Sequence, residues 1–158
     1  MDFLLYAPEN PGNLGSIIRT SASFGIDRLF VFDEHSLLEG KNLERVKAVS
    51  CGHHDDVVVE SVSEPVSFVK SYDDKFVAMI SRLRSKQLHE VSFPKDGIVT
   101  FGNESKGVPR KINRIYGTKR VMIPTKGHNY CLGLPVAYSL FLYEYLAQHT
   151  EGFPSVKW

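Results

Sequence analysis

Short apolar runs alternate along this chain with longer amphipathic stretches. Several of the short runs, such as residues 57–59 and 98–101, lack the polar–apolar alternation of a half-exposed strand. Unbroken apolar runs of this length are typical of strands that are covered on both faces. The pattern predicts six strands, at residues 3–7, 28–32, 57–61, 76–81, 98–102 and 120–124.

The longer stretches have helical periodicity. They predict helices at residues 14–24, 42–48, 65–71, 109–116 and 134–149. Strands and helices in alternation indicate an α/β fold with a largely parallel sheet and flanking helices. We expect one domain over residues 1–150, followed by a short tail at 151–158.

The first predicted helix has two different faces. Asn13 is a candidate N-cap, and an apolar stripe follows it. A second face carries small residues and one cation: Gly12, Gly15, Ser16 and Arg19. This face would lie near the carboxyl end of a strand, where open α/β sheets bind ligands.

The last predicted helix is apolar nearly all round. Between residues 134 and 147 only Ser139 and Glu144 are clearly polar. Such a helix is either buried on all sides or shared with a partner. Since a terminal helix is hard to bury completely in a domain this small, we expect a homodimer through this helix.

Composition narrows the class of protein. Apolar residues make up 42% of the 158 residues and charged residues 23%, which is typical of a soluble globular protein. No apolar run approaches the length of a membrane span. We expect no secretory signal, because no basic segment precedes a hydrophobic one at the start of the sequence. Cys51 and Cys131 do not form a C-x-x-C pair, so we expect a reduced, cytoplasmic protein.

Charge is unevenly distributed. Residues 1–66 hold 5 basic and 11 acidic side chains, whereas residues 67–158 hold 14 basic and 7 acidic ones. Residues 106–120 include six lysines and arginines and no acid. Such a cluster can pair with phosphates, and it can equally be a solvated surface.

Common nucleotide and metal motifs are missing. No G-x-G-x-x-G follows a strand, and Val108 stands where a P-loop needs lysine after Gly102 and Gly107. Residues 51–56 contain cysteine, histidines and aspartates, but their spacing matches no zinc motif. We expect a polar surface loop there and no metal.

Three segments together identify a family. They are residues 8–19 (PENPGNLGSIIR), residues 101–109 (FGNESKGVP), and residues 122–144, which contain MIP and CLGL. In this order and spacing they resemble the SPOUT superfamily, specifically its SpoU or TrmH-like RNA ribose 2′-O-methyltransferases. The short chain is most similar to the minimal enzymes that act on the tRNA wobble nucleotide.

The resemblance implies a fold and a cofactor site. It implies a deep trefoil knot in the carboxyl-terminal part and S-adenosylmethionine bound by loops of that knot. The positions that it assigns to the cofactor are Met79, Gly102, Ile123, Cys131, Leu132 and Leu134.

The resemblance also implies three catalytic residues: Arg19, Asn13 and Glu104. Arg19 would act as a base or as a bidentate phosphate clamp, and a structural arginine is the alternative. Asn13 is a helix cap, a catalytic group or both. Glu104 either organises its loop or acts directly.

RNA is the expected substrate: tRNA is the leading interpretation, and ribosomal RNA is the alternative. Candidate RNA-binding residues are Arg82, Lys106, Arg110, Lys111, His128 and Tyr130. The third segment departs from the family, because Cys131 and Gly133 replace a serine and an asparagine. That change leaves open a catalytically weak RNA-binding protein.

Overall fold

In the computed structural model, residues 1–80, 84–128 and 131–149 are described, and they contain a seven-stranded parallel sheet. Its order is β3-β2-β1-β6-β4-β7-β5, which confirms the predicted α/β fold. The strands are β1 (Asp2–Tyr6), β2 (Arg28–Phe32), β3 (Val58–Ser61), β4 (Lys75–Met79), β5 (Lys86–Gln87), β6 (Ile98–Phe101) and β7 (Thr118–Met122).

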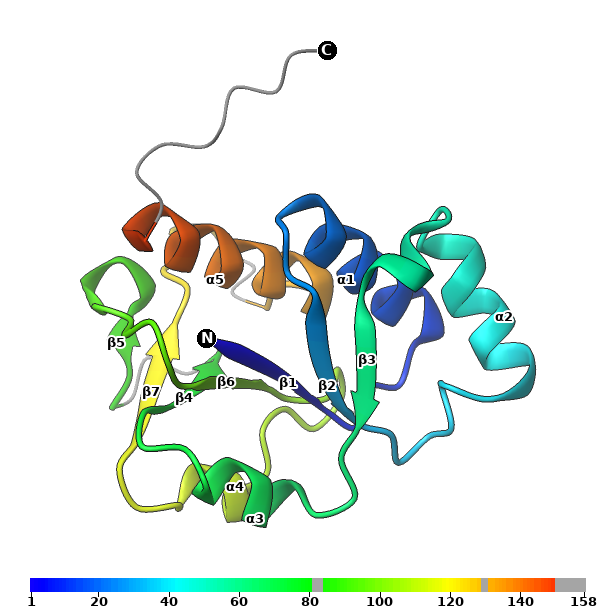
Figure 1. The fold of residues 1–158 in the computed structure, drawn as a ribbon. Helices are drawn as coiled ribbons and strands as arrows, with labels where there is room; N and C mark the ends of the chain where they lie inside the picture. Colours follow the sequence, from blue (N-terminus) through cyan, green and yellow to red (C-terminus); the bar gives the residue numbers. More distant parts are fainter. Residues whose placement is uncertain (81–83, 129–130, 150–158) are drawn as a thin grey trace.

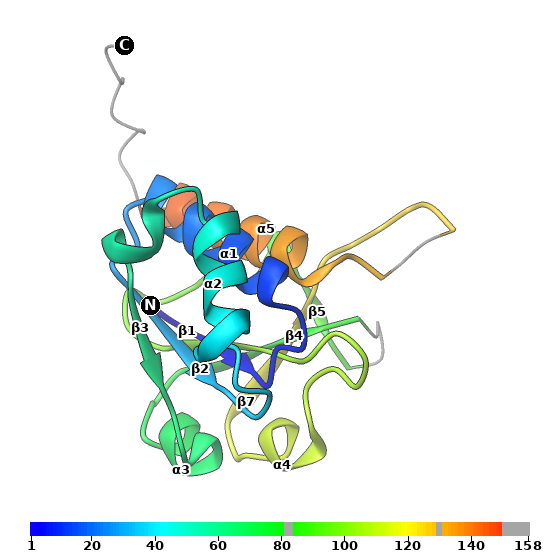
Figure 2. The ribbon, with the colours of Figure 1, turned by 90° about the vertical axis from the view of Figure 1, so that its right-hand side faces the viewer.

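Helices cover both faces of the sheet (Figure 1 and Figure 2). On one face lie α1 (Pro11–Ser23), α2 (Gly40–Val49) and α5 (Leu134–His149), and on the other lie α3 (Pro65–Lys70) and α4 (Arg110–Asn113). Two short 3₁₀ turns, η1 (His53–Asp56) and η2 (Leu88–Glu90), complete the described elements. The predicted tail lies outside the described residues.

Strand β1 shows why the unbroken apolar runs form this sheet. Successive strand residues point to opposite faces. Phe3 and Leu5 pack with residues of α1 and α5, whereas Leu4 and Tyr6 pack with residues of α3 and α4. All four are buried, so a strand between two helical layers needs apolar residues on both faces.

The first helix begins earlier than predicted. Asn10, not Asn13, is the N-cap: its Oδ1 accepts hydrogen bonds from the backbone N–H groups of Gly12 (2.8 Å) and Asn13 (3.3 Å). Pro11 occupies the first helical position, where no N–H is needed. The prediction that Asn13 caps the helix was therefore wrong, and its side chain is available for another contact.

The order in which the chain adds strands to the sheet reverses between β1 and β6. From β1 the chain builds outward through β2 and β3, and then β6, β4, β7 and β5 occupy the other side. Ligands of open parallel sheets gather at such a switch point, beyond the carboxyl ends of the strands. The carboxyl ends of β4, β6 and β7 thus meet at one edge. The knot that the resemblance implies stays a prediction.

Strand β5 and helix α4 also differ from the sequence prediction. Strand β5 was not predicted, because Lys86 and Gln87 carry no apolar signal, and it joins the sheet beside β7. Helix α4 covers only Arg110–Asn113 within the predicted 109–116. Arg114 ends the helix, and the chain turns at Gly117, whose φ is +80°, into β7.

Candidate active site

A pocket opens at the carboxyl ends of β4, β6 and β7, beside the first turns of α5. All six residues that the resemblance assigns to the cofactor line it: Met79, Gly102, Ile123, Cys131, Leu132 and Leu134. Phe101, Ala137 and Phe141 add apolar surface, and Asn103 and Glu104 add polar groups. Residues spread over more than fifty positions of sequence thus meet in one place.

Gly102 is required by the backbone of its own loop. A Cβ atom at this position would lie 2.1 Å from the Gly107 carbonyl carbon and 2.2 Å from the Val108 nitrogen. The resemblance assigns Gly102 to the cofactor site. In the structure the atoms that approach it belong to residues 107 and 108, so the glycine shapes the pocket wall from inside the protein.

Asn13 and Glu104 bridge two loops. The Asn13 Nδ2 atom donates a hydrogen bond to Glu104 Oε1 at 2.8 Å, and the Glu9 backbone N–H donates to Glu104 Oε2 at 2.8 Å. Both carboxylate oxygens of Glu104 therefore have partners from the segment that follows β1. Two of the three predicted catalytic residues lie together, at the switch point of the sheet.

Glu9 strengthens the same bridge from the other side. Its Oε1 accepts hydrogen bonds from Ser105 Oγ (2.6 Å) and Asn103 Nδ2 (2.8 Å). The bond from Ser105 is the largest influence that lowers the pKa of the Glu9 carboxyl below its ordinary value of 4.5. Sequence reasoning missed Glu9. Its one signal was its place inside the first recognised segment.

Asn103 folds the turn after β6. It is buried, and its Oδ1 accepts hydrogen bonds from the backbone N–H groups of Ser105 (3.0 Å) and Lys106 (2.6 Å). A side-chain oxygen that bonds the backbone two and three residues later is a common way to close a turn. This turn places Glu104 at the pocket.

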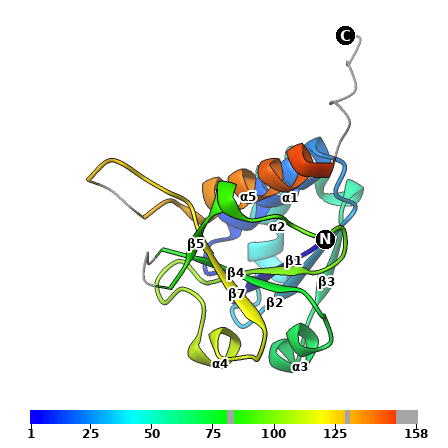
Figure 3. The same cartoon turned by 90° about the vertical axis from the view of Figure 1, so that its left-hand side faces the viewer.

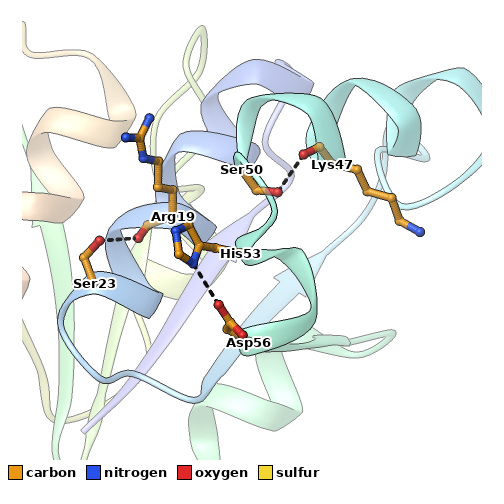
Figure 4. Close-up of polar contacts among 6 residues, drawn as sticks. All are labelled: Arg19, Ser23, Lys47, Ser50, His53 and Asp56. Atoms are coloured by element: carbon orange, nitrogen blue, oxygen red, sulfur yellow. Dashed lines mark hydrogen bonds and ion pairs between the residues drawn. The ribbon is translucent and has the colours of Figure 1, made fainter.

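Arg19 lies away from the pocket, on the exposed surface of α1. Figure 4 shows its side chain extending from α1, near the turn that contains His53. Its Nη1 donates to the Cys51 sulfur at 3.4 Å. The third predicted catalytic residue is thus not brought to Asn13 and Glu104. It is six residues after Asn13, about 9 Å along the helix axis.

The small-residue face of α1 serves helix packing at its centre. Gly15 is buried, and a Cβ there would lie 2.6 Å from the Val46 carbonyl oxygen of α2. The expected open ligand-binding face is therefore wrong at Gly15, because α2 covers it.

Four of the predicted RNA-binding residues lie within the described ranges, and all four are on the surface. Lys106, Arg110, Lys111 and His128 are exposed. Lys111 Nζ lies over the ring of Tyr6, 5.4 Å from its centroid, and over Phe32 at 5.9 Å. Arg82 and Tyr130 lie outside the described residues.

The histidine- and aspartate-rich segment forms η1. His53 Nδ1 and Asp56 Oδ2 are 2.8 Å apart, and both side chains are exposed. Within residues 1–80, 84–128 and 131–149, no three histidine, cysteine or acidic residues are arranged to hold a metal ion.

Residues 1–143 match the SpoU rRNA Methylase family. The chain belongs to this family. The family match covers all the residues that line the pocket and all those that form the Glu9–Glu104 bridge. A SpoU methylase uses S-adenosylmethionine as its methyl donor.

Known proteins of the same kind are similar over nearly the whole chain. The tRNA (cytidine(34)-2′-O)-methyltransferase of Saccharophagus degradans is 29% identical and aligns over 99% of both chains. The TrmH/SpoU tRNA modifying enzyme of Aquifex aeolicus is 26% identical, with a TM-score of 0.79, over 93% of this chain and 74% of that one.

An AdoMet-bound rRNA methyltransferase from Sinorhizobium meliloti has the same fold, with a TM-score of 0.79 at 23% identity. The SpoU chain described here spans 56% of that longer protein. Within the described part of the present chain, every helix is too short or too polar to cross a bilayer.

The pocket fits S-adenosylmethionine in its chemistry. Ile123, Leu132 and Leu134 offer apolar surface for a planar adenine, and strand-end backbone groups offer hydrogen bonds. Glu104 supplies a carboxylate in the same pocket, opposite in charge to a sulfonium.

Proposed function

We propose that this SpoU methylase transfers a methyl group from S-adenosylmethionine to a ribose 2′-hydroxyl of RNA, and that its substrate is tRNA. The observation that carries the proposal is the pocket. It joins all six expected cofactor residues with Glu104, which Asn13 holds at 2.8 Å. A relative of the same length, 99% covered on both chains, is named a tRNA (cytidine(34)-2′-O)-methyltransferase, which favours the wobble ribose.

S-adenosylmethionine supplies an already activated methyl group, so the chain must chiefly align the hydroxyl oxygen with it. The loops after β4, β6 and β7 would hold the donor through Met79, Gly102 and Ile123. Glu104 would face the reacting groups, with its orientation fixed by Asn13 and by the Glu9 N–H. Because both of its oxygens already accept hydrogen bonds, the orientation of the Glu104 carboxylate would be fixed before RNA binds.

Arg19 would act on the RNA. A guanidinium hardly ever loses its proton, so a phosphate clamp is chemically easier than a general base. Its exposure on α1, outside the pocket, supports contact with a phosphate near the ribose. Lys106, Arg110, Lys111 and His128 would add charge around the pocket, and Arg82 and Tyr130 are proposed from sequence alone.

A homodimer through α5 is part of the proposal. Tyr138 of α5 is buried against α1, where its hydroxyl lies 2.6 Å from Ser21 Oγ. The opposite face exposes Val136 (50%), Leu140 (40%) and Tyr143 (52%). These residues are spaced by four and three, so they form one apolar stripe. A second copy would remove that stripe from water.

We also propose that the protein is cytoplasmic. Residues 1–150 would form its single domain. Cys51 and Cys131 are exposed and do not form a disulfide with each other, which suits a reducing compartment.

The test is label transfer. The purified protein is incubated with S-adenosylmethionine that carries a labelled methyl group and with total RNA, and nuclease mapping locates the label. We expect label in tRNA, near the anticodon. Label in ribosomal RNA alone would replace the proposed substrate. Donor binding without any transfer to RNA would contradict the proposed activity.

A further inference from the structure

A second depression lies at the edge of the sheet where β5 pairs with β7. Figure 3 shows where these two strands lie in the fold. We call it the edge groove. It encloses about 630 Å³, and the residues used below are Arg84, Lys86, Glu90, Lys119, Arg120 and Val121. None of them lines the cofactor pocket.

The edge groove is rich in positive charge. Its lining residues include one carboxylate, Glu90, and four cations: Arg84, Lys86, Lys119 and Arg120. Glu90 is already engaged, because its oxygens accept hydrogen bonds from the Gln87 backbone N–H (3.1 Å) and Nε2 (3.3 Å).

The four cations of the edge groove differ in their partners. Lys119 pairs with Asp74 at 2.7 Å, and Arg120 reaches a backbone carbonyl at 3.5 Å. Arg84 and Lys86 are exposed and form no ion pair with any residue in the described ranges. A groove with exposed, unpaired cations attracts an anion.

Strand β7 connects the edge groove to the cofactor pocket. Its residues 118–121 line the groove, and Ile123, just beyond its end, lines the pocket. Three residues of strand, from Arg120 to Ile123, span about 10 Å. Lys86 lies level with Val121 in the register of β5 and β7. The cations near Arg120 therefore lie about 10 Å from the pocket, a distance that a few nucleotides of RNA can span.

We propose that the edge groove binds the phosphate backbone of the RNA next to the methylated ribose. The proposal rests on the proposed function and adds the path that the strand takes. An extended polyanion suits the groove better than a small anion, because the cations are spread over β5, β7 and the segment before β5 rather than converging on one point.

Another role for Lys86 makes a different prediction. Lysine on an edge strand prevents pairing with a second sheet. Under that role alone, removing the charge would promote self-association and leave the affinity for RNA unchanged.

The test compares two double variants of the full chain. Arg84→Ala with Lys86→Ala removes the unpaired cations of the groove. Lys41→Ala with Lys47→Ala is the matched control, because both lysines are exposed on α2 and neither lines the groove or the pocket. Binding of a mixed tRNA preparation is measured by fluorescence anisotropy over a range of salt concentrations. Calorimetry with S-adenosylmethionine follows for each protein.

We expect the groove variant to bind tRNA about tenfold more weakly at low salt. The slope of log affinity against log salt should fall by about 1.4 to 1.8, as for two lost phosphate contacts. Affinity for S-adenosylmethionine should not change in either variant. Equal tRNA binding by the groove variant and the wild type, or an equal loss in the control, would overturn the proposal.

Failure of the proposed function would look different. If the wild-type protein binds S-adenosylmethionine but neither binds nor methylates RNA, the proposed function fails, and the groove proposal fails with it. If the wild type methylates tRNA and the groove variant matches it in affinity and salt slope, only the groove proposal fails.

Discussion

At the scale of single residues, the candidate site depends on hydrogen bonds between the segment after β1 and the turn after β6. Asn13 and the Glu9 N–H hold Glu104, and the Glu9 carboxylate holds Asn103 and Ser105. Hydrogen bonds to an ionised carboxylate are shorter and stronger than neutral ones. The orientation of Glu104 therefore depends on the charge of Glu9, which does not line the pocket.

Glu9→Gln keeps the size of the side chain and removes its charge. We expect methyl transfer to fall by about 10- to 100-fold, since a small misplacement of a reacting group is costly. Single-turnover methylation measures this. Glu39→Gln is the matched control, because Glu39 is exposed before α2 and its side chain caps nothing. Equal rates for Glu9→Gln and the wild type would show that the bridge is dispensable.

Because the pKa of Glu9 is lowered, the contribution of its carboxylate to the stability of the fold should depend on pH. A carboxyl whose pKa is lowered by folding stabilises the fold above its ordinary pKa of 4.5, and the contribution is lost as the pH falls through the lowered value. The difference in unfolding midpoint between the wild type and Glu9→Gln should be full at neutral pH and should vanish at acid pH. A difference that grows on acidification would contradict this sign.

Arg19→Ala should leave the fold and S-adenosylmethionine binding intact, since Arg19 is exposed and outside the pocket. Methyl transfer should fall by about 10²-fold, because loss of a phosphate clamp would misplace the ribose against the methyl group. Arg19→Lys keeps the charge but loses the planar fork, so a phosphate clamp should recover little. Arg45→Ala, on the exposed surface of α2, is the control. Normal turnover by Arg19→Ala would remove Arg19 from the mechanism.

At the scale of elements, Gly102 ties the turn after β6 to its own backbone. Gly102→Ala places a Cβ about 2.1 Å from the Gly107 carbonyl carbon, so the turn must shift. We expect a loss of about 1–3 kcal/mol in the free energy of unfolding, measured with urea, and weaker S-adenosylmethionine binding. Gly127→Ala is the control, since its Cβ would meet no atom within 4 Å. A Gly102→Ala protein with wild-type stability and donor affinity would refute the packing argument.

Most elements could be predicted from sequence, because strands covered on both faces and amphipathic helices leave clear apolar patterns. The predicted helix at 134–149 has the bounds of α5. Strand β5 could not be predicted, since Lys86–Gln87 has no apolar period and is held by pairing with β7. The start of α1 was misplaced because Asn10 and Asn13 are the same residue type, and only the Asn10 hydrogen bonds distinguish them.

The pocket could be assembled only from the family resemblance. Its residues come from loops after three strands and from α5, and no spacing rule in sequence brings them together. The role of Glu9 was hidden because its partners, Asn103 and Ser105, are more than ninety residues away. Arg19 and Glu104 were predicted to belong to one catalytic site, yet within one chain Arg19 lies outside the pocket that Glu104 lines.

At the scale of the whole molecule, the exposed stripe of α5 predicts association. Leu140→Glu should convert a dimer to a monomer at micromolar concentration, because a charge in an apolar interface is costly. Sedimentation analysis measures this. Val58→Glu is the control, since Val58 is an apolar residue that is 60% exposed and lies on the edge strand β3, not on α5. A wild-type protein that sediments as a monomer would contradict the proposed dimer.

If the proposed function is correct, this SpoU methylase modifies the ribose of RNA and not the base. The most direct measurement uses S-adenosylmethionine with a trideuterated methyl group, unmodified tRNA and the wild-type protein. The tRNA is digested to nucleosides, and mass spectrometry then separates the ribose from the base. We expect the label on the ribose, as a 2′-O-methyl nucleoside, and its loss in Arg19→Ala. Label on the base, or no label in RNA under conditions where the protein binds S-adenosylmethionine, would contradict the proposed function.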